Sequence, residues 1–271
     1  MIRSMYSGIS GLKNFQTKLD VIGNNIANVN THGFKKGRTI FKDLYSQTVA
    51  GASEPGTTRG GVNPKQIGLG AQLATIDTIH SPGSTQFTGN TLDLAIEGDG
   101  LFIVGDPAGE KFYTRAGNFY LDAGTGGGDA NLVDGDGRFV LDDSGTNKIT
   151  IPLSATSLSV GQDGQVSYID SAGLLTPAGV IGLAKFNNPG GLEKAGSNLY
   201  KESVNSGIAT PGAPLGPDGH GAIKSGSLEM SNVDLSEEFT EMIVAQRGFQ
   251  ANTRIITTSD EILQELVNLK R

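Results

Sequence analysis

Residues 5–29 read Met5-Tyr-Ser-Gly-Ile-Ser-Gly-Leu-Lys-Asn-Phe-Gln-Thr-Lys-Leu-Asp-Val-Ile-Gly-Asn-Asn-Ile-Ala-Asn-Val29. Two series of residues spaced seven apart run through this stretch: Met5, Leu12, Leu19 and Ile26, and Gly8, Phe15, Ile22 and Val29. Seven of these eight are apolar, whereas the positions between them are mostly small or polar. The spacing predicts a helix with one narrow apolar seam, which is typical of a coiled-coil strand. Such a seam needs a partner helix, and the chain supplies a second seam only at its far end.

Glycine and proline divide the chain into three parts. Of the 40 glycines, five lie in residues 1–50 and one in residues 231–271, and all ten prolines lie between Pro55 and Pro217. Helix breakers are therefore rare at both ends and concentrated in the middle. We predict a terminal helical polymerisation domain from residues 1–35 and 234–271, a helix and linker in 36–90, and a β-rich outer domain in 91–233.

A second long helix is predicted at the C-terminal end. Asp234 and Glu237 have the spacing of a capping box. Met242, Phe249, Ile256 and Leu263 then repeat every seven residues. The companion series is Phe239, Gln246, Thr253, Asp260 and Val267, and its middle three members are polar. Two explanations remain open: these three side chains face solvent, or they leave a looser inner wall that lets neighbouring subunits slide, as a bending joint requires.

The region after the first helix is expected to be partly helical. Ile40, Phe41, Leu44 and Tyr45 would share one side of a short helix in residues 36–50. Residues 51–70 are rich in Gly, Ser, Thr, Pro and Asn, which predicts an exposed loop or linker, and Ala71–His80 could be extended.

Short apolar runs separated by turn residues fill the middle of the chain. Leu92–Ile96 and Leu101–Val104 flank Gly98-Asp-Gly100, and Leu158–Val160 and Val166–Tyr168 flank Asp163-Gly164 as a hairpin. Further strands are predicted in residues 112–120, 137–141, 148–153 and 180–186. The fold class is therefore α+β: terminal helices forming a coiled-coil-like domain, with a central antiparallel β-rich barrel or sandwich.

Composition and motifs exclude several classes of function. The chain has no cysteine and a net charge of −7, so a thiolate metal site is impossible and nucleic-acid binding is disfavoured. No run of 18 apolar residues and no cleavable signal peptide are present. Asp-Gly pairs are interpreted as tight turns rather than calcium loops, and the three histidines are expected to be solvated. We find no catalytic motif and expect no enzyme activity, no cofactor and no bound metal.

Several segments resemble one family. Leu19-Asp-Val-Ile-Gly-Asn-Asn-Ile-Ala-Asn-Val-Asn-Thr-His-Gly-Phe-Lys35 looks like the N-terminal signature of bacterial flagellar rod and hook proteins. Residues 92–102, 113–119, 191–200 and 228–234 resemble further motifs of that family, and residues 242–250 and 257–269 resemble its C-terminal signature. The resemblance thus spans the chain and is most specific at both ends.

The resemblance implies a structural protomer of a helical tube. Residues 242–247 and 264–271 are more similar to hook proteins, which link rod to filament and transmit motor torque, whereas the length is nearer that of the distal rod protein. We expect a short hook protein of Gram-positive type, with the distal rod protein as the alternative. A different class also stays open: a secreted or cell-surface β-domain adhesin or enzyme with dimerising helices.

The same resemblance implies partners and a location. We expect self-association, contacts with other flagellar axial proteins (rod, hook–filament junction, hook cap) and the export apparatus, no nucleic acid and no membrane insertion. The location would be the basal body and hook, outside the cytoplasmic membrane, after export without a cleaved signal peptide.

Residues 1 to about 30 and about 240 to 271 should be mobile in the free monomer. The residues expected to mediate self-assembly are Met5, Leu12, Phe15, Leu19, Ile22, Ile26, Val29, Phe239, Met242, Phe249, Ile256, Leu263 and Val267.

Overall fold

The computed structural model of the chain describes residues 2–55, 60–107, 109–124, 129–217 and 219–269. It divides into two compact units, and each is described here by itself. Unit 1 comprises Met1–Ala27, Gly37–Thr78 and Asp234–Arg271, and unit 2 comprises Asn28–Lys36 and Ile79–Val233. The extreme positions Met1, Lys270 and Arg271 of the predicted terminal domain lie outside the described residues.

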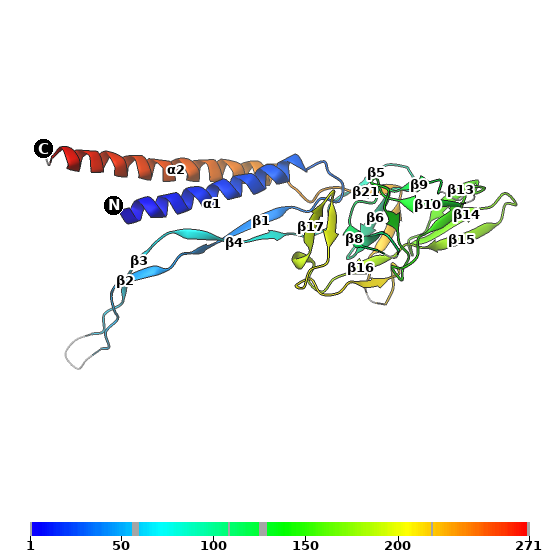
Figure 1. Cartoon of the computed structure of the whole chain (residues 1–271), viewed down its shortest axis with the longest axis horizontal. Helices are drawn as coiled ribbons and strands as arrows, with labels where there is room; N and C mark the ends of the chain where they lie inside the picture. The colour runs from blue at the N-terminus through cyan, green and yellow to red at the C-terminus, as the bar shows by residue number, and fades with distance from the viewer. Residues whose placement is uncertain (1, 56–59, 108, 125–128, 218, 270–271) are drawn as a thin grey trace. The chain divides into compact units, whose positions relative to one another are not determined.

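Two long helices, α1 (Ile2–Ala27) and α2 (Leu235–Asn268), belong to unit 1 (Figure 1). The prediction of a helix at each end of the chain is confirmed. Helix α1 stops two residues before the predicted end at Val29, because Asn28–Asn30 form a turn in which Thr31 N donates to Asn28 O. Helix α2 begins as predicted: Asp234 accepts hydrogen bonds from the backbone N–H groups of Ser236 (2.8 Å) and Glu237 (3.5 Å).

A long β-hairpin completes unit 1, and here the predicted helix in residues 36–50 is wrong. Strand β1 (Gly37–Asp43) pairs with β4 (Ala71–Thr78), and β2 (Ser46–Ala50) pairs with β3 (Lys65–Gly68). Exposure alternates along most of β1, which is the two-residue period of a strand. The expected extension of Ala71–His80 is confirmed. Residues 51–70 are not all loop, since they contain β3 and a bridge from Ser53 to Val62, and residues 56–59 lie outside the described part of the chain.

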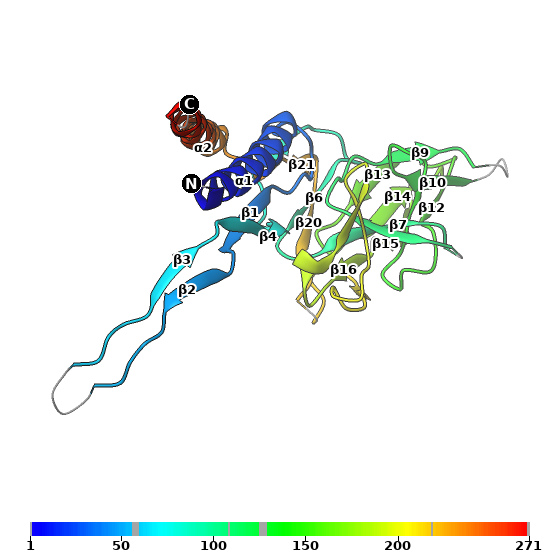
Figure 2. The same cartoon turned by 60° about the vertical axis from the view of Figure 1, so that its left-hand side comes forward.

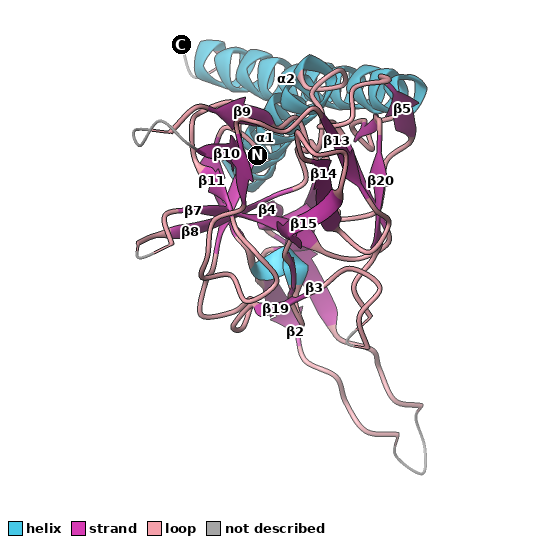
Figure 3. Ribbon diagram, turned by 90° about the vertical axis from the view of Figure 1, so that its right-hand side faces the viewer, coloured by secondary structure: helices cyan, strands magenta, loops and turns pink. Residues whose placement is uncertain are grey.

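Unit 2 is built from strands and loops, with one turn of 3₁₀ helix (Figure 3). Its strands are β5 (Thr85–Phe87), β6 (Leu94–Glu97), β7 (Leu101–Gly105), β8 (Lys111–Thr114), β9 (Tyr120–Asp122), β10 (Asp129–Val133), β11 (Phe139–Val140), β12 (Thr150–Pro152), β13 (Ser157–Val160), β14 (Gln165–Ile169), β15 (Leu175–Val180), β16 (Leu183–Lys185), β17 (Glu193–Gly196), β18 (Leu199–Lys201), β19 (Thr210–Gly212), β20 (Ala222–Ser225) and β21 (Ser227–Glu229), and its 3₁₀ turn is η1 (Pro189–Gly191).

Strand pairing in unit 2 is antiparallel, as predicted, but not always between neighbours in sequence. The hairpin of β13 and β14 is confirmed, with Gly164 at φ 75° in its turn. By contrast, β6 pairs with β20 rather than with β7, which pairs with β8, β11 and β16. The largest sheet follows the order β12-β10-β11-β7-β8-β18-β17 and does not close among the described strands. The α+β class is confirmed, whereas the barrel or sandwich is not.

The core of unit 2 lies between these strands. Fourteen buried residues form its main cluster: Leu94, Ile96, Phe102, Val104, Phe119, Leu132, Val140, Ile149, Ile151, Val166, Ile181, Leu183, Leu199 and Ile223. The rings of Phe102 and Phe119 meet edge to face with centroids 5.1 Å apart, a favourable aromatic geometry. A second cluster around Leu101 and Tyr113 includes residues of β7, β8, β16 and β18. This unit is therefore large enough to bury its own core.

Candidate assembly site: the paired terminal helices

Helices α1 and α2 pair within one chain and run antiparallel. Figures 1 and 2 show them side by side, with both chain ends at the same end of the pair. The contacts show the antiparallel direction, because the residue numbers of the partners on α2 fall as those on α1 rise. The contacting pairs are Gly8 with Ile256, Gly11 with Asn252, Phe15 with Gly248, Lys18 with Glu241, and Asn25 with Glu238.

Glycines allow a short distance between the two helices. A methyl group on Gly248 would lie 2.5 Å from the Phe15 ring, and one on Gly11 would lie 2.8 Å from the Asn252 amide nitrogen. These glycines cost helix propensity, but they allow the two backbones to approach. Gly23 differs, because nothing lies within 4 Å of the position of an added methyl group.

Polar contacts fix the register where α1 ends. Asn25 is 2% exposed, and its amide nitrogen donates to Glu238 Oε2 (3.1 Å) and to Gly37 O (2.9 Å). The Asn25 oxygen accepts from Gly37 N at 3.0 Å. One side chain therefore ties α1 to both α2 and the start of β1. Lys18 and Glu241 form a further ion pair along the helices.

Most of the predicted assembly residues of α1 lie on its covered side. Ile22 is buried, and Met5, Leu12, Phe15, Leu19 and Ile26 are half-buried. Val29 lies beyond the helix, in unit 2, and is also half-buried. In α2, Met242, Ile256 and Leu263 are half-buried, whereas Phe239, Phe249 and Val267 are exposed. The role of these residues in assembly stays a prediction.

The companion face of α2 differs from the expected one. The covered residues Glu238, Ala245, Asn252 and Ser259 repeat every seven positions, one residue before the predicted series. Gln246, Thr253 and Asp260 are exposed, as in the explanation that they face solvent. Small and polar residues thus face α1. The glycines of α1 were the available signal, because a helix that approaches this closely needs small side chains opposite.

Large apolar side chains remain exposed on the outer sides of unit 1. On α2 they include Phe239, Ile243, Val244, Ile255, Ile262 and Leu266, with Leu269 directly after the helix; on the hairpin they include Tyr45, Val49, Val62, Ile67 and Ile76. Exposed apolar surface of this extent is typical of surfaces that bind another protein. No helix within the described residues is long and apolar enough to cross a membrane.

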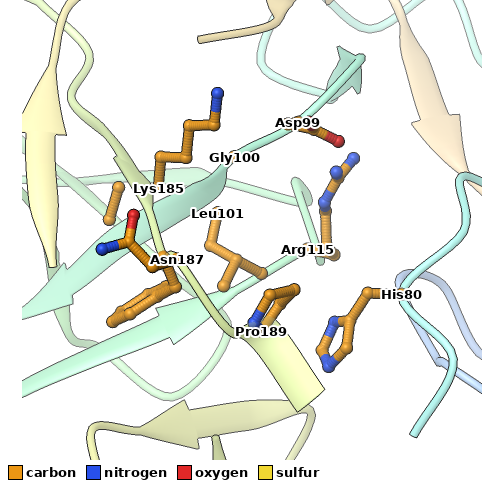
Figure 4. Close-up of a pocket in the computed structure, with 10 residues that line it drawn as sticks. His80, Asp99, Gly100, Leu101, Arg115, Lys185, Asn187 and Pro189 are labelled. Carbon is orange, nitrogen blue, oxygen red and sulfur yellow. The ribbon is translucent and has the colours of Figure 1, made fainter. Parts of the chain in front are cut away.

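Unit 2 contains a cavity of about 330 Å³, which Figure 4 shows in close-up. Arg115 and Asp99 lie on one side of it, Asn187 on another, and His80 beside Pro189. Burial and the nearby cations Lys35, Arg115 and Lys194 lower the pKa of His80 to about 4, so its imidazole is neutral at physiological pH. Within the described residues, no group of three or more metal-ligating side chains gathers.

The histidines are not solvated as expected. His220 is 5% exposed, and its Nε2 lies 3.1 Å from Thr210 O. His80 is half-buried, and its ring centroid lies 5.3 Å from that of Tyr200. The ring partner of His80 lies 120 positions away, so its local context gave no sign of burial, whereas His220 contacts Thr210 only ten positions away.

Three family models match separate parts of the chain. Residues 5–35 match "Flagella basal body rod protein", residues 95–168 match "Flagellar hook protein FlgE/F/G D1 domain", and residues 224–269 match "Flagellar basal body rod FlgEFG protein C-terminal". The matches therefore cover the paired helices and part of unit 2.

Whole-length relatives agree with these models. The chain is 64% identical over 271 residues to the flagellar basal-body rod protein FlgG of Bacillus subtilis (strain 168), with 100% of both chains covered. It is 39% identical over 276 residues to FlgG of Borreliella burgdorferi, and 32% identical over 443 residues to the flagellar hook protein FlgE of that organism, again with 100% of each chain covered. The chain belongs to the flagellar rod and hook protein family, FlgE/F/G.

Proposed function

We propose that this chain is the structural protomer of the flagellar distal rod. The observation that carries the proposal is the match of 64% identity to a rod protein over 271 residues, with neither chain extending beyond the other. The hook relative at 32% identity needs an alignment of 443 residues, which is far longer than this chain. The comparisons thus favour the alternative over the hook protein that the end segments suggested. Family members are structural proteins, which confirms that the chain is not an enzyme.

Assembly would use unit 1. The helix pair covers most of the apolar seam of α1 within the chain, while apolar side chains on the outer side of α2 and on the hairpin stay exposed. A repeated contact between two different surfaces of one chain produces an open helical polymer. We infer that neighbouring copies cover these side chains, and that adjacent axial proteins of the flagellum cap the polymer at its two ends.

The expected location follows from this role. The protomer would leave the cytoplasm through the flagellar export apparatus, without a cleaved signal peptide, and join the axial structure outside the cytoplasmic membrane. The mobility of both chain ends before assembly remains a prediction. Pairing of α1 with α2 within one chain is compatible with it if that pairing forms only on assembly.

Site-specific labelling tests the location. The chain contains no cysteine, so Ser171→Cys at an exposed turn of unit 2 gives one thiol per subunit. Isolated hook–basal bodies carrying this variant would be treated with maleimide-gold and imaged by electron microscopy. Labelling between the basal rings and the hook is expected, and the unsubstituted protein is the control. Gold along the curved hook would reject the rod assignment in favour of a hook protein.

A further inference from the structure

Three charged side chains are buried together in unit 2. Lys35 is 0% exposed, Glu229 1% and Arg115 4%. Lys35 Nζ lies 2.6 Å from Glu229 Oε1, and Arg115 Nη1 lies 3.0 Å from Glu229 Oε2. One carboxylate therefore binds two cations, each through a different oxygen.

Backbone groups form further hydrogen bonds with this cluster. Lys35 also donates to Ser81 O at 2.8 Å, and Arg115 Nη2 donates to Gly98 O at 2.6 Å. Gly83 N donates to Glu229 Oε1 at 2.9 Å. Burial alone would raise the pKa of Glu229, but Arg115, Lys35 and these hydrogen bonds together lower it. The carboxylate is thus held in its ionised form.

The cluster lies where the chain enters and leaves unit 2. The chain passes between units after residues 27, 36, 78 and 233. Lys35 precedes the second of these crossings by one residue, and Ser81 follows the third by three. Glu229 lies four residues before the last crossing, and its backbone oxygen accepts from Gly33 N at 2.9 Å.

The neutral side chain of Asn232, one residue before the last crossing, forms hydrogen bonds with backbone groups beside the second and third crossings. Its Oδ1 accepts from Lys36 N at 2.8 Å, and its Nδ2 donates to Ile79 O at 2.8 Å. Ile79 N in turn donates to Lys36 O at 3.0 Å. Strands β1 and β4 and helix α2 begin or end within a few residues of these bonds.

We propose that Lys35, Arg115, Glu229 and Asn232 form a clasp that fixes where three segments leave unit 2, and that rod assembly depends on this arrangement. These are positioning residues, since they act through the elements that start beside them. The proposal rests on the proposed role in the rod.

Physical chemistry favours positioning over stability as the reason for the clasp. A buried ion cluster is weak evidence for stability, because well-packed apolar residues often replace one without loss. Directional bonds, however, select one arrangement of the groups that they join. In a helical polymer every subunit must meet several neighbours at once, so small errors in the starting points of its elements would disturb every contact.

Asn232→Leu is the most direct test, because it removes the bonds to Lys36, Ile79 and Ser81 and leaves all three charges paired. Asn188→Leu is the matched control: Asn188 also donates to a backbone oxygen, that of Asn205 at 3.2 Å, away from the crossings. Hydrogen exchange on each purified full-length variant reports the Lys36 and Ile79 amides, and thermal unfolding reports the fold. Both genes are then tested for rod formation in a strain that lacks the wild-type gene, well below the unfolding midpoint.

The expected result separates position from stability. Asn232→Leu should unfold within a few degrees of the wild type and exchange its Lys36 amide faster. It should nevertheless leave most cells without a complete rod, whereas Asn188→Leu assembles normally. Normal rods in cells with Asn232→Leu, despite faster exchange at Lys36, would overturn the clasp.

Lys35→Met provides a second test through the charges. It leaves Glu229 with Arg115 alone, and Lys224→Met is its control, because Lys224 pairs with Glu97 at the exposed surface at 3.3 Å. If Lys35→Met is folded at the assay temperature, the proposal requires that it also fails to form rods. If it is unfolded, the result for Asn232→Leu alone decides whether the proposal holds. Complementation with the wild-type gene tests the proposed function separately. If it restores only a hook on an already complete rod, the assignment to the distal rod is wrong, whatever the variants do.

Discussion

At the scale of single residues, the chemistry of this protein is that of buried polar groups. His80 is the case with a measurable pH dependence. Its pKa is lowered from 6.5 to about 4 by burial and by nearby cations. Between these two pH values the unfolded chain binds a proton that the folded chain does not, so the free energy of unfolding rises with pH across this window.

We predict that the wild type loses about 1–2 kcal/mol of stability relative to His80→Gln as the pH falls from 7 to 4. The full linkage value would be larger, but the ring is partly exposed and solvent screens it. Urea unfolding of both proteins, followed by near-ultraviolet circular dichroism of tyrosine, measures the difference at each pH. The stability of the wild type minus that of His80→Gln should rise between about pH 4 and pH 6.5 and be level outside this window. A difference that stays constant through the window would show that His80 does not titrate in this way.

At the scale of elements, replacing glycine by alanine should have opposite effects on stability at two positions in the helix pair. Gly248→Ala places a methyl group 2.5 Å from the Phe15 ring, so it should separate the helices and lower the stability of the pair. Gly23→Ala meets no atom within 4 Å and should stabilise α1 by about 0.8–1 kcal/mol. Thermal unfolding followed at 222 nm ranks the two variants against the wild type. Equal effects would mean that Phe15 does not pack on Gly248.

A second prediction at this scale concerns the half-buried apolar residues of the two helices. Leu19→Asp or Leu263→Asp places a charge among half-buried apolar side chains, at a cost of about several kcal/mol. Both should abolish polymerisation of the purified protein, whereas Gln246→Asp, on the exposed side of α2, should change it less. Turbidity and electron microscopy of the polymer provide the measurement. Polymerisation of Leu263→Asp at the wild-type concentration would contradict the observed register.

Elements set by local signals could be predicted from the sequence. The cap at Asp234, the turn at Asp163-Gly164 and the heptads of α1 all act between near neighbours. The hairpin of residues 37–78 could not, because Ile40, Phe41, Leu44 and Tyr45 suit a helix as well as a strand, and the deciding partner strand lies about 30 residues away. The face of α2 that meets α1 was missed for a related reason: close packing against glycine selects small residues, which hydrophobic periodicity does not detect.

At the scale of the whole molecule, contacts between residues that are remote in sequence hold the fold together. Glu229 binds Lys35 from 194 positions away and Arg115 from 114 positions away. The sequence showed that both end segments belong to one family, but nothing local indicated that they meet in one buried cluster. Contacts of such sequence separation order slowly. We therefore predict that Glu229→Gln speeds unfolding of unit 2 more than it slows refolding, measured by stopped-flow tyrosine fluorescence, while Glu97→Gln at the surface changes neither rate as much.

Imaging a strain that lacks only this gene tests the central claim, that the chain builds the distal rod, most directly. Electron cryotomography of such cells would show how far each axial structure extends from the membrane. The distal rod assignment predicts basal bodies with a shortened rod and no hook, and complementation by the wild-type gene should restore both. A rod of full length without a hook would contradict the assignment and identify the chain as the hook protein.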